Sequence, residues 1–116
     1  MQTILVVDDD TLYSEVLQKE LTEAGYNVLT AENGEIALKI VETNTIQLIL
    51  LDLLMPKVDG TTFYFQLKKK LKKHIPIIIL TNIQDSAAYD EDIKDILIKA
   101  NVSLTDIIKK VNEYLL

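Results

Sequence analysis

The stretch Ile46-Gln47-Leu48-Ile49-Leu50-Leu51-Asp52-Leu53-Leu54-Met55-Pro56 is an apolar run that ends at a single carboxylate and is closed by a proline. A strand covered on both faces of a sheet is apolar throughout rather than alternating, so we predict a central strand of a parallel sheet over residues 46–51. Asp52 then follows the carboxyl end of this strand, where open α/β sheets bind ligands. A lone aspartate at a strand end often only caps a helix, so its function depends on which other residues reach the same edge.

Other apolar stretches predict the elements around this strand. Short runs at residues 4–7, 26–30, 75–80 and 96–98 have the length of buried strands. Apolar residues at helical spacing predict four helices, at residues 12–24, 36–41, 63–71 and 104–115, and a weaker pattern at residues 84–94 predicts a short fifth helix. Asp10, Asn33 and the pair Ser103 and Asp106 are suited to cap three of them. Five strands alternating with five helices predict a doubly wound parallel α/β sheet.

The composition limits the class of protein. The 116 residues, 48% of them hydrophobic and 26% charged, predict one globular domain over residues 1–116. The apolar runs are too short to span a membrane, and the N-terminus has no signal-peptide pattern. The absence of cysteine excludes disulfides and thiolate metal sites, which fits a cytoplasmic protein. The net charge of −6 argues against direct binding of nucleic acid.

All twelve basic residues are lysines, and five of them lie within residues 68–73. We favour a solvated helix face for this run over a binding patch, because terminal cations are also favoured by the helix dipole. His74 follows in a connection, and we expect it at the surface, without a partner that would make it catalytic.

The predicted strands bring polar residues from distant parts of the sequence to one edge. Connections in parallel sheets are right-handed, so all strand tips point to one rim. This rim receives Asp8 and Asp9 after the first strand, Asp52 after the third, Thr81 after the fourth and Lys99 after the fifth. Two carboxylates ~5 Å apart at an effective dielectric of ~20 repel by about 3 kcal/mol, so cations are needed there.

An all-oxygen set of this kind suits Mg²⁺, and Lys99 adds a second positive charge. Phosphoryl transfer uses the same components: a nucleophile, and cations on the oxygens of the migrating group. A carboxylate can be that nucleophile. If Asp8 and Asp9 hold the metal, Asp52 is the natural phosphoacceptor, and Thr81 can donate its hydroxyl to a phosphoryl oxygen.

With these motifs, the chain resembles the receiver domain of bacterial two-component response regulators over essentially its whole length. The resemblance rests on Ile4-Leu5-Val6-Val7-Asp8-Asp9-Asp10, on Asp52-Leu53-Leu54-Met55-Pro56-Lys57-Val58-Asp59-Gly60, on Pro76-Ile77-Ile78-Ile79-Leu80-Thr81 and on Ile98-Lys99. It implies a flavodoxin-like fold with strand order 2-1-3-4-5. It also implies a cytoplasmic signalling module that is no enzyme beyond catalysing its own phosphorylation and dephosphorylation.

The resemblance further assigns roles and partners. Asp52 accepts a phosphoryl group from a histidine kinase or phosphotransfer protein and signals by conformational switching to a downstream effector protein or domain. Mg²⁺ is held directly by Asp9, through water by Asp8, and by Asp52 itself and the backbone carbonyl of Leu54. Thr81 is the switch hydroxyl, and Lys99 contacts the phosphoryl group.

The chain departs from the family's usual pattern near its output side. Ala100 stands where a proline usually follows the lysine, so we predict a trans peptide bond and a shifted Lys99 loop. Ile96 stands where an aromatic switch residue is usual, and Asn82 replaces a small residue and narrows the access to Asp52. The short interval between Thr81 and Lys99 predicts that the weak helix at residues 84–94, the fourth along the chain, is abbreviated or irregular.

Two alternatives stay open from the sequence. One is a pseudo-receiver, a protein-binding module that keeps the fold and has lost the switch. The other is a phosphatase similar to the haloacid dehalogenase group, because Asp8-Asp9-Asp10-Thr11 approaches its first motif. That alternative needs an acidic pair after Lys99, where the sequence offers only Asp106 and Glu113.

Overall fold

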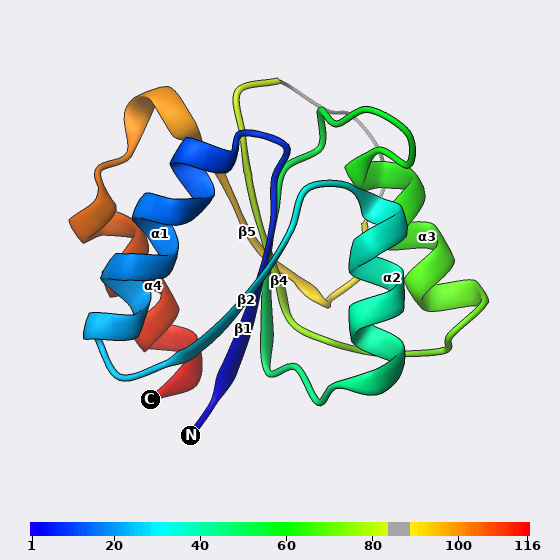
Figure 1. Cartoon of the computed structure of the whole chain (residues 1–116), viewed down its shortest axis with the longest axis horizontal. Helices are drawn as coiled ribbons and strands as arrows, with labels where there is room; N and C mark the ends of the chain where they lie inside the picture. Colours follow the sequence, from blue (N-terminus) through cyan, green and yellow to red (C-terminus); the bar gives the residue numbers. More distant parts are fainter. Residues whose placement is uncertain (84–88) are drawn as a thin grey trace.

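The computed structural model describes residues 1–83 and 89–116, and within these residues five strands form one parallel sheet. The strand order β2-β1-β3-β4-β5 confirms the predicted order 2-1-3-4-5. Because all pairings are parallel, the carboxyl ends of the strands lie at one edge, the upper edge in Figure 1, which we call the rim. The strands are β1 (Thr3–Val7), β2 (Asn27–Ala31), β3 (Leu48–Leu51), β4 (Ile77–Thr81) and β5 (Ile93–Ile98).

Helices cover both faces of the sheet. Figure 1 shows α1 and α4 on one face and α2 and α3 on the other. In the described part of the chain, no helix is both long enough and apolar enough to cross a bilayer. The helices are α1 (Thr11–Glu23), α2 (Gly34–Thr43), α3 (Gly60–Lys69) and α4 (Leu104–Leu115), and a 3₁₀ turn, η1 (Lys99–Asn101), follows β5.

Side-chain caps set where these helices begin. The side chains of Asp10 and Asn33 accept hydrogen bonds from backbone amides of α1 and α2, as predicted. Ser103 and Asp106 form both bonds of the predicted capping box at α4. Asp59 caps α3 in the same way, through the amide of Thr62 at 2.8 Å. Each cap satisfies amides that have no partner within the helix, which stabilises the start of the helix by about 1 kcal/mol.

The central strand β3 is buried along its whole length, which confirms its predicted place inside the sheet. Its side chains alternate between the two layers of the core: Leu48 and Leu50 pack under α1 and α4, and Ile49 and Leu51 pack under α2 and α3. Full burial of each such side chain contributes roughly 2 kcal/mol. The strand begins at Leu48 rather than Ile46, although Ile46 is also buried.

The predicted fifth helix is not found, and the described residues hold four α-helices rather than five. Residues 84–88 of that prediction lie outside the described residues. Residues 89–92 form no helix, and Ile93 and Lys94 already belong to β5, so the predicted strand over residues 96–98 is too short. Ile93 pairs with Ile77 of β4, so the last residues of the predicted helix belong to the sheet instead.

Candidate functional site

Four of the predicted site residues meet at the rim. Asp8 follows β1, Asp52 follows β3, Thr81 ends β4 and Lys99 follows β5. The Lys99 Nζ atom lies 2.5 Å from Asp8 Oδ2 and 3.1 Å from Asp52 Oδ2. The Thr81 hydroxyl donates a hydrogen bond to Asp52 Oδ1 at 2.7 Å. Asp52 therefore contacts a hydroxyl through one carboxylate oxygen and an ammonium through the other.

The register of the sheet produces this convergence. Val7 pairs with Leu51, so the residues that follow them, Asp8 and Asp52, lie side by side on neighbouring strands. The Asp52 amide also donates to the Val7 carbonyl at 2.9 Å, which extends the ladder by one bond beyond β3. Thr81 pairs with Ile98 and therefore lies beside the start of the turn that carries Lys99.

The N-terminus of α3 fixes the backbone after Asp52. The Gly60 amide donates to the Leu53 carbonyl at 3.1 Å, and the Leu54 amide donates to Asp52 Oδ1 at 3.2 Å. A Cβ atom on Gly60 would lie 2.3 Å from the backbone oxygen of Asp52. Only glycine allows α3 to approach the Asp52 peptide this closely, so Gly60 is a positioning residue for the site.

The site holds more negative charge than its lysine neutralises. Asp8 and Asp52 are 4% and 7% exposed. Burial raises the pKa of Asp8, because it disfavours the carboxylate more than the hydrogen bond from Lys99 favours it. Burial lowers the pKa of Lys99. Its hydrogen bonds with Asp8 and Asp52 outweigh this effect, so that the net pKa of Lys99 is raised. Lys99 therefore stays charged and leaves a net negative pocket.

This pocket fits a divalent cation. Asp8, Asp9 and Asp52 each offer a carboxylate oxygen, and these oxygens lie within 4.8 Å of one another. Asp9 is exposed at the mouth of the group, whereas the other two aspartates are buried. Hard oxygen ligands with remaining open positions are the type of set that Mg²⁺ prefers. The chemistry of these three carboxylates thus fits Mg²⁺.

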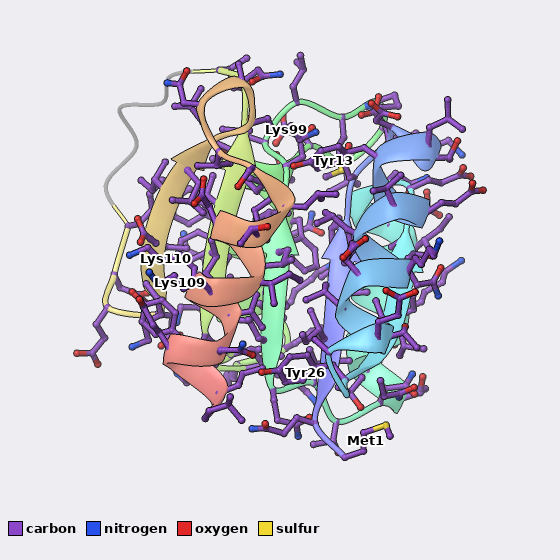
Figure 2. All side chains as sticks on the ribbon, turned by 90° about the vertical axis from the view of Figure 1, so that its left-hand side faces the viewer. Met1, Tyr13, Tyr26, Lys99, Lys109 and Lys110 are labelled. Carbon is purple, nitrogen blue, oxygen red and sulfur yellow. The ribbon has the colours of Figure 1, made fainter. Side chains whose placement is uncertain are left out.

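Two contacts in the neighbourhood of Lys99 were not predicted from the sequence. Figure 2 shows Tyr13 of α1 close to Lys99 at the rim, with the Lys99 Nζ atom 4.6 Å from the centre of the Tyr13 ring. Asn82 accepts a hydrogen bond from the Ala100 amide at 2.9 Å and so ties the end of β4 to the 3₁₀ turn. The Lys99–Ala100 bond is trans, as predicted, because the described residues contain no cis peptide bond.

The residue in place of the family's aromatic switch lies on the surface. Ile96 is 49% exposed on β5, outside both core layers. Tyr114 of α4 is 39% exposed and donates its hydroxyl to the carbonyl of Lys94, also on β5. The exposed Ile96 and the hydrogen-bonded Tyr114 thus lie on two elements that contact each other, β5 and α4.

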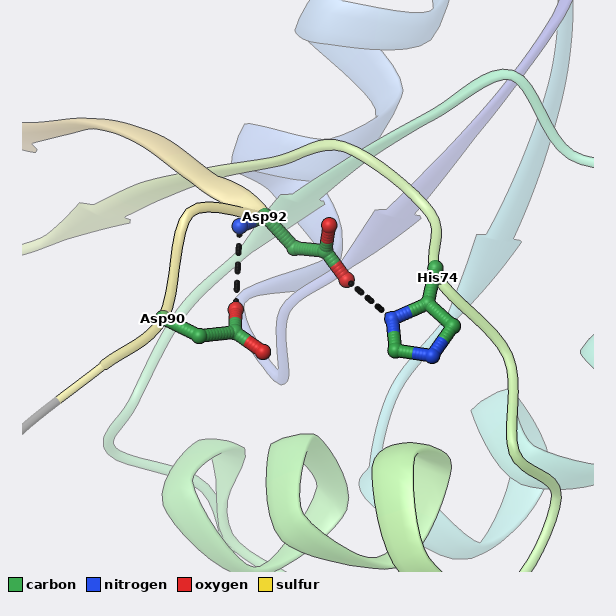
Figure 3. Close-up of side chains that lie close together, drawn as sticks. All are labelled: His74, Asp90 and Asp92. Atoms are coloured by element: carbon green, nitrogen blue, oxygen red, sulfur yellow. Dashed lines mark hydrogen bonds and ion pairs between the residues drawn. The ribbon is translucent and has the colours of Figure 1, made fainter.

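A second group of potential metal ligands lies away from the rim, before the amino-terminal ends of β4 and β5, and a lysine holds it together. His74, Asp90 and Asp92 each offer a ligand atom, and Figure 3 shows His74 Nδ1 directed at Asp92 Oδ2, 3.1 Å away. The Lys68 ammonium contacts both aspartates, with a distance of 2.8 Å to Asp90 Oδ2. Because this ammonium already supplies the positive charge, we assign the group a structural role.

This group corrects one expectation from the sequence. The lysine run of residues 68–73 was expected on a solvated face, but the Lys68 side chain is only 12% exposed. His74 lies at the surface as expected, with its side chain 71% exposed, and it contacts Lys68 and Asp92. These contacts could not be predicted, because Asp90 and Asp92 reach α3 only when β5 begins at Ile93.

Comparison with known proteins gives the family. A model of the response regulator receiver domain matches residues 4–112. The chain is 48% identical over 82 residues to the probable transcriptional regulator ycf27 of Cyanidium caldarium, and 43% identical over 94 residues to the alkaline phosphatase synthesis transcriptional regulatory protein PhoP of Bacillus subtilis. The matches cover 71% and 81% of this chain but 32% and 36% of those proteins, so the chain spans about a third of these relatives.

Solved structures agree over the full chain. The response regulator TrrA of Thermotoga maritima, solved in complex with Mg²⁺ and BeF, is 36% identical with a TM-score of 0.83, and the match covers 100% of both chains. TrrA in complex with the histidine kinase ThkA gives 34% identity and a TM-score of 0.81, again over 100% of both chains. Receiver domains are generally signalling modules rather than enzymes, and phosphorylation on an aspartate is typical of them. The chain belongs to the response regulator receiver domain family.

Proposed function

We propose that residues 1–116 form a receiver domain that accepts a phosphoryl group on Asp52. One observation carries this proposal: the Asp52 carboxylate receives the Thr81 hydroxyl at 2.7 Å on one oxygen and the Lys99 ammonium at 3.1 Å on the other. Asp8 contacts Lys99 but makes no hydrogen bond to Thr81 among the described residues. Asp52 is thus the carboxylate around which groups suited to a phosphoryl oxygen are already arranged.

The transfer uses a simple displacement. A carboxylate oxygen of Asp52 attacks the phosphorus of a phosphohistidine, the new O–P bond forms as the N–P bond breaks, and the donor imidazole leaves with the electron pair. Lys99 neutralises charge on the migrating oxygens, and Thr81 moves its hydrogen bond from Asp52 to one of them. This step is the domain's own phosphorylation. In its own dephosphorylation, water attacks the phosphorus, the O–P bond to Asp52 breaks, and the carboxylate leaves together with inorganic phosphate.

Magnesium would be held by carboxylates of Asp8, Asp9 and Asp52 and by the backbone carbonyl of Leu54. When bound, the ion supplies positive charge to the phosphoryl oxygens. Asp9 is exposed at the mouth of the pocket and would ligate the ion directly, whereas the buried Asp8 would act through water.

We further propose the partners that such a domain requires. The donor is a histidine kinase or a phosphotransfer protein in the cytoplasm, and the output is a downstream effector protein or domain. Support comes from TrrA, which was solved with a histidine kinase, and from relatives that are transcriptional regulators. The net charge of −6 disfavours direct contact of this domain with nucleic acid.

Phosphorylation by a small donor tests the proposal. After incubation with acetyl phosphate and Mg²⁺, we expect the intact mass to rise by one phosphoryl group, and we expect Asp52→Asn to abolish this rise. Asp59→Asn is the matched control, because Asp59 is an exposed aspartate that caps α3. No added mass, or added mass that persists in Asp52→Asn, would favour the pseudo-receiver alternative, for which the exposed Ile96 is the motivating observation.

The phosphatase alternative finds no support in the geometry. Its second acidic pair would have to come from Asp106 and Glu113, and both lie on α4. The Asp106 side chain accepts the Ser103 amide at 2.9 Å, and Glu113 pairs with Lys110 at 3.5 Å. Neither carboxylate belongs to the acidic group at the rim.

A further inference from the structure

We propose that Tyr13 is a positioning residue for the phosphoryl transfer, because its ring keeps the Lys99 ammonium beside Asp52. The Lys99 Nζ atom lies 4.6 Å from the centre of the Tyr13 ring, within the range of a cation–π contact (Figure 2). The Lys99 side chain is only 12% exposed, so water competes little with the ring for the ammonium. The inference rests on the proposed phosphorylation of Asp52 and adds to it a residue of α1.

The ring is a third contact of an ammonium group that has three N–H bonds to donate. Asp8 Oδ2 lies 2.5 Å from the Lys99 Nζ atom, and Asp52 Oδ2 lies 3.1 Å from it. Both of these contacts are with negative charges. The contact with the Tyr13 ring differs from them, because the ring attracts the ammonium without carrying a net charge.

This difference matters because the two carboxylates that contact Lys99 are also potential ligands of the metal ion. Positive charge from Mg²⁺ next to Asp8 and Asp52 would offset their negative charge, so both carboxylates would attract the Lys99 ammonium less. The attraction between the Tyr13 ring and the ammonium does not pass through these carboxylates. The ring therefore keeps Lys99 at the rim under the conditions in which the transfer takes place.

Two hydrogen bonds at the start of α1 fix the ring relative to the site. The Asp10 amide donates to Asp8 Oδ1 at 3.0 Å, and the Tyr13 amide donates to Asp10 Oδ1 at 3.1 Å. The Tyr13 side chain also packs against the core layer under α1 and α4. The cap of α1 thus connects the Tyr13 backbone to Asp8, and the ring and Asp8 both contact Lys99.

The ring, rather than its hydroxyl, makes the contact with Lys99. In the described part of the chain the Tyr13 hydroxyl has no hydrogen-bond partner. Tyr13→Phe therefore keeps everything that the inference requires. Tyr13→Leu keeps an apolar side chain that can pack against the core but has no aromatic face. The pair of variants separates the role of the ring face from that of apolar packing.

The rate of phosphorylation by acetyl phosphate and Mg²⁺, followed by intact mass, tests the inference without a partner protein that could dock on α1. We expect Tyr13→Leu to be phosphorylated about fivefold more slowly than the unchanged chain, because Lys99 is in place in a smaller fraction of the molecules. Tyr13→Phe should stay within about twofold of the unchanged chain, since phenylalanine also binds cations through its face.

Phe65→Leu is the matched control, because it makes the same kind of change at a 39% exposed ring of α3, outside the site. It should leave the rate unchanged. A Tyr13→Leu variant that is phosphorylated as fast as Tyr13→Phe would overturn the inference. An equal loss of rate in Phe65→Leu would overturn it as well.

NMR measures the contact itself. Protons over the face of an aromatic ring are shifted upfield, so the ε-methylene protons of Lys99 should be shifted upfield in the unchanged chain and in Tyr13→Phe, but not in Tyr13→Leu. Their signal is assigned by its absence from Lys99→Met, and the amide spectrum of each sample shows that the variant is folded. We expect the upfield shift to persist when Mg²⁺ is added. Its loss on addition of Mg²⁺ would overturn the inference.

The inference and the proposed function fail in different ways. If the unchanged chain gains no phosphoryl group, the proposed function is refuted and the inference falls with it. If Asp52 is phosphorylated but the Lys99 signal shows no upfield shift in the presence of Mg²⁺, only the role of Tyr13 is refuted.

Discussion

At the scale of single residues, Gly60 is the glycine at which an added side chain would be most crowded. We expect Gly60→Ala to lower the free energy of unfolding by about 2–3 kcal/mol, because the added methyl group would overlap the Asp52 and Leu53 backbone. Chemical denaturation measures this change. Because the overlap displaces the Asp52 peptide, phosphorylation by acetyl phosphate should slow as well.

Gly25→Ala is the control for Gly60→Ala. Gly25 has a φ of 102° and no atom within 4 Å of an added Cβ, so alanine there is strained but not crowded. A loss of about 1 kcal/mol with unchanged phosphorylation is expected. If Gly60→Ala behaved in the same way, close packing of α3 on Asp52 would not be what positions the site.

The rim residues could be predicted because each follows an apolar run in the sequence. The ends of these runs locate Asp8, Asp52, Thr81 and Lys99, and parallel pairing brings them together. Tyr13 and Asn82 could not be found in this way. Tyr13 lies inside a helix, and its contact with Lys99 depends on how α1 packs against the sheet. Asn82 acts by accepting the Ala100 amide, a bond that no sequence pattern marks.

At the scale of elements, Lys68 links α3 to the chain that enters β5. We expect Lys68→Met, which keeps the apolar stem, to lower the free energy of unfolding by about 2 kcal/mol, because the partly buried Asp92 loses its cation. Lys69→Met is the matched control on the exposed side of α3 and should change stability by less than about 0.5 kcal/mol. Equal effects would mean that Lys68 is as dispensable as its solvated neighbour.

The effect of Lys68→Met should depend on pH. Burial raises the pKa of Asp90, but its hydrogen bonds with Lys68 and Tyr64 lower it more, and the net pKa lies below the ordinary value. A carboxylate with a lowered pKa in the folded state stabilises the fold above its unfolded-state pKa and loses this contribution as the pH falls through the folded-state value. The difference between the unchanged chain and Lys68→Met should therefore shrink below about pH 4. A difference that grows in acid would contradict this assignment.

The one element predicted wrongly shows where local pattern is insufficient. Residues 84–94 carry few apolar residues, so no periodicity there was strong enough to separate a helix from a strand. Ile93 joins the sheet because β4 offers an unpaired edge, and the backbone amide of Ile77 bonds to the Asp92 carbonyl at 2.8 Å. Pairing of this kind is set by the neighbouring strand, so the sequence of residues 84–94 alone could not show where β5 starts.

At the scale of the whole molecule, the doubly wound parallel sheet followed from the sequence because the chain alternates apolar strands with amphipathic helices. The strand order 2-1-3-4-5 was implied only by the resemblance to receiver domains, and the structure has this order. The two core layers are then unavoidable, since each strand of a sheet covered on both faces must bury alternate residues on either side. The negative charge of the rim belongs to this scale as well. It arises from strands far apart in sequence, and its electrostatic strain acts on the stability of the entire domain.

Magnesium should relieve that strain and stabilise the whole fold. At a concentration ten times its dissociation constant, Mg²⁺ adds about 1.4 kcal/mol to the free energy of unfolding, which for a domain of this size raises the melting temperature by about 5 °C.

The Asp9→Asn variant should respond differently. Without metal we expect it to melt at a higher temperature than the unchanged chain, because one repelling carboxylate is gone, and we expect Mg²⁺ to raise its melting temperature less. Thermal melts of both proteins with and without Mg²⁺ measure this, with Asp59→Asn as the control outside the pocket. An Asp9→Asn variant that melts below the unchanged chain without metal, or gains as much from Mg²⁺, would show that Asp9 neither strains the rim nor binds the ion.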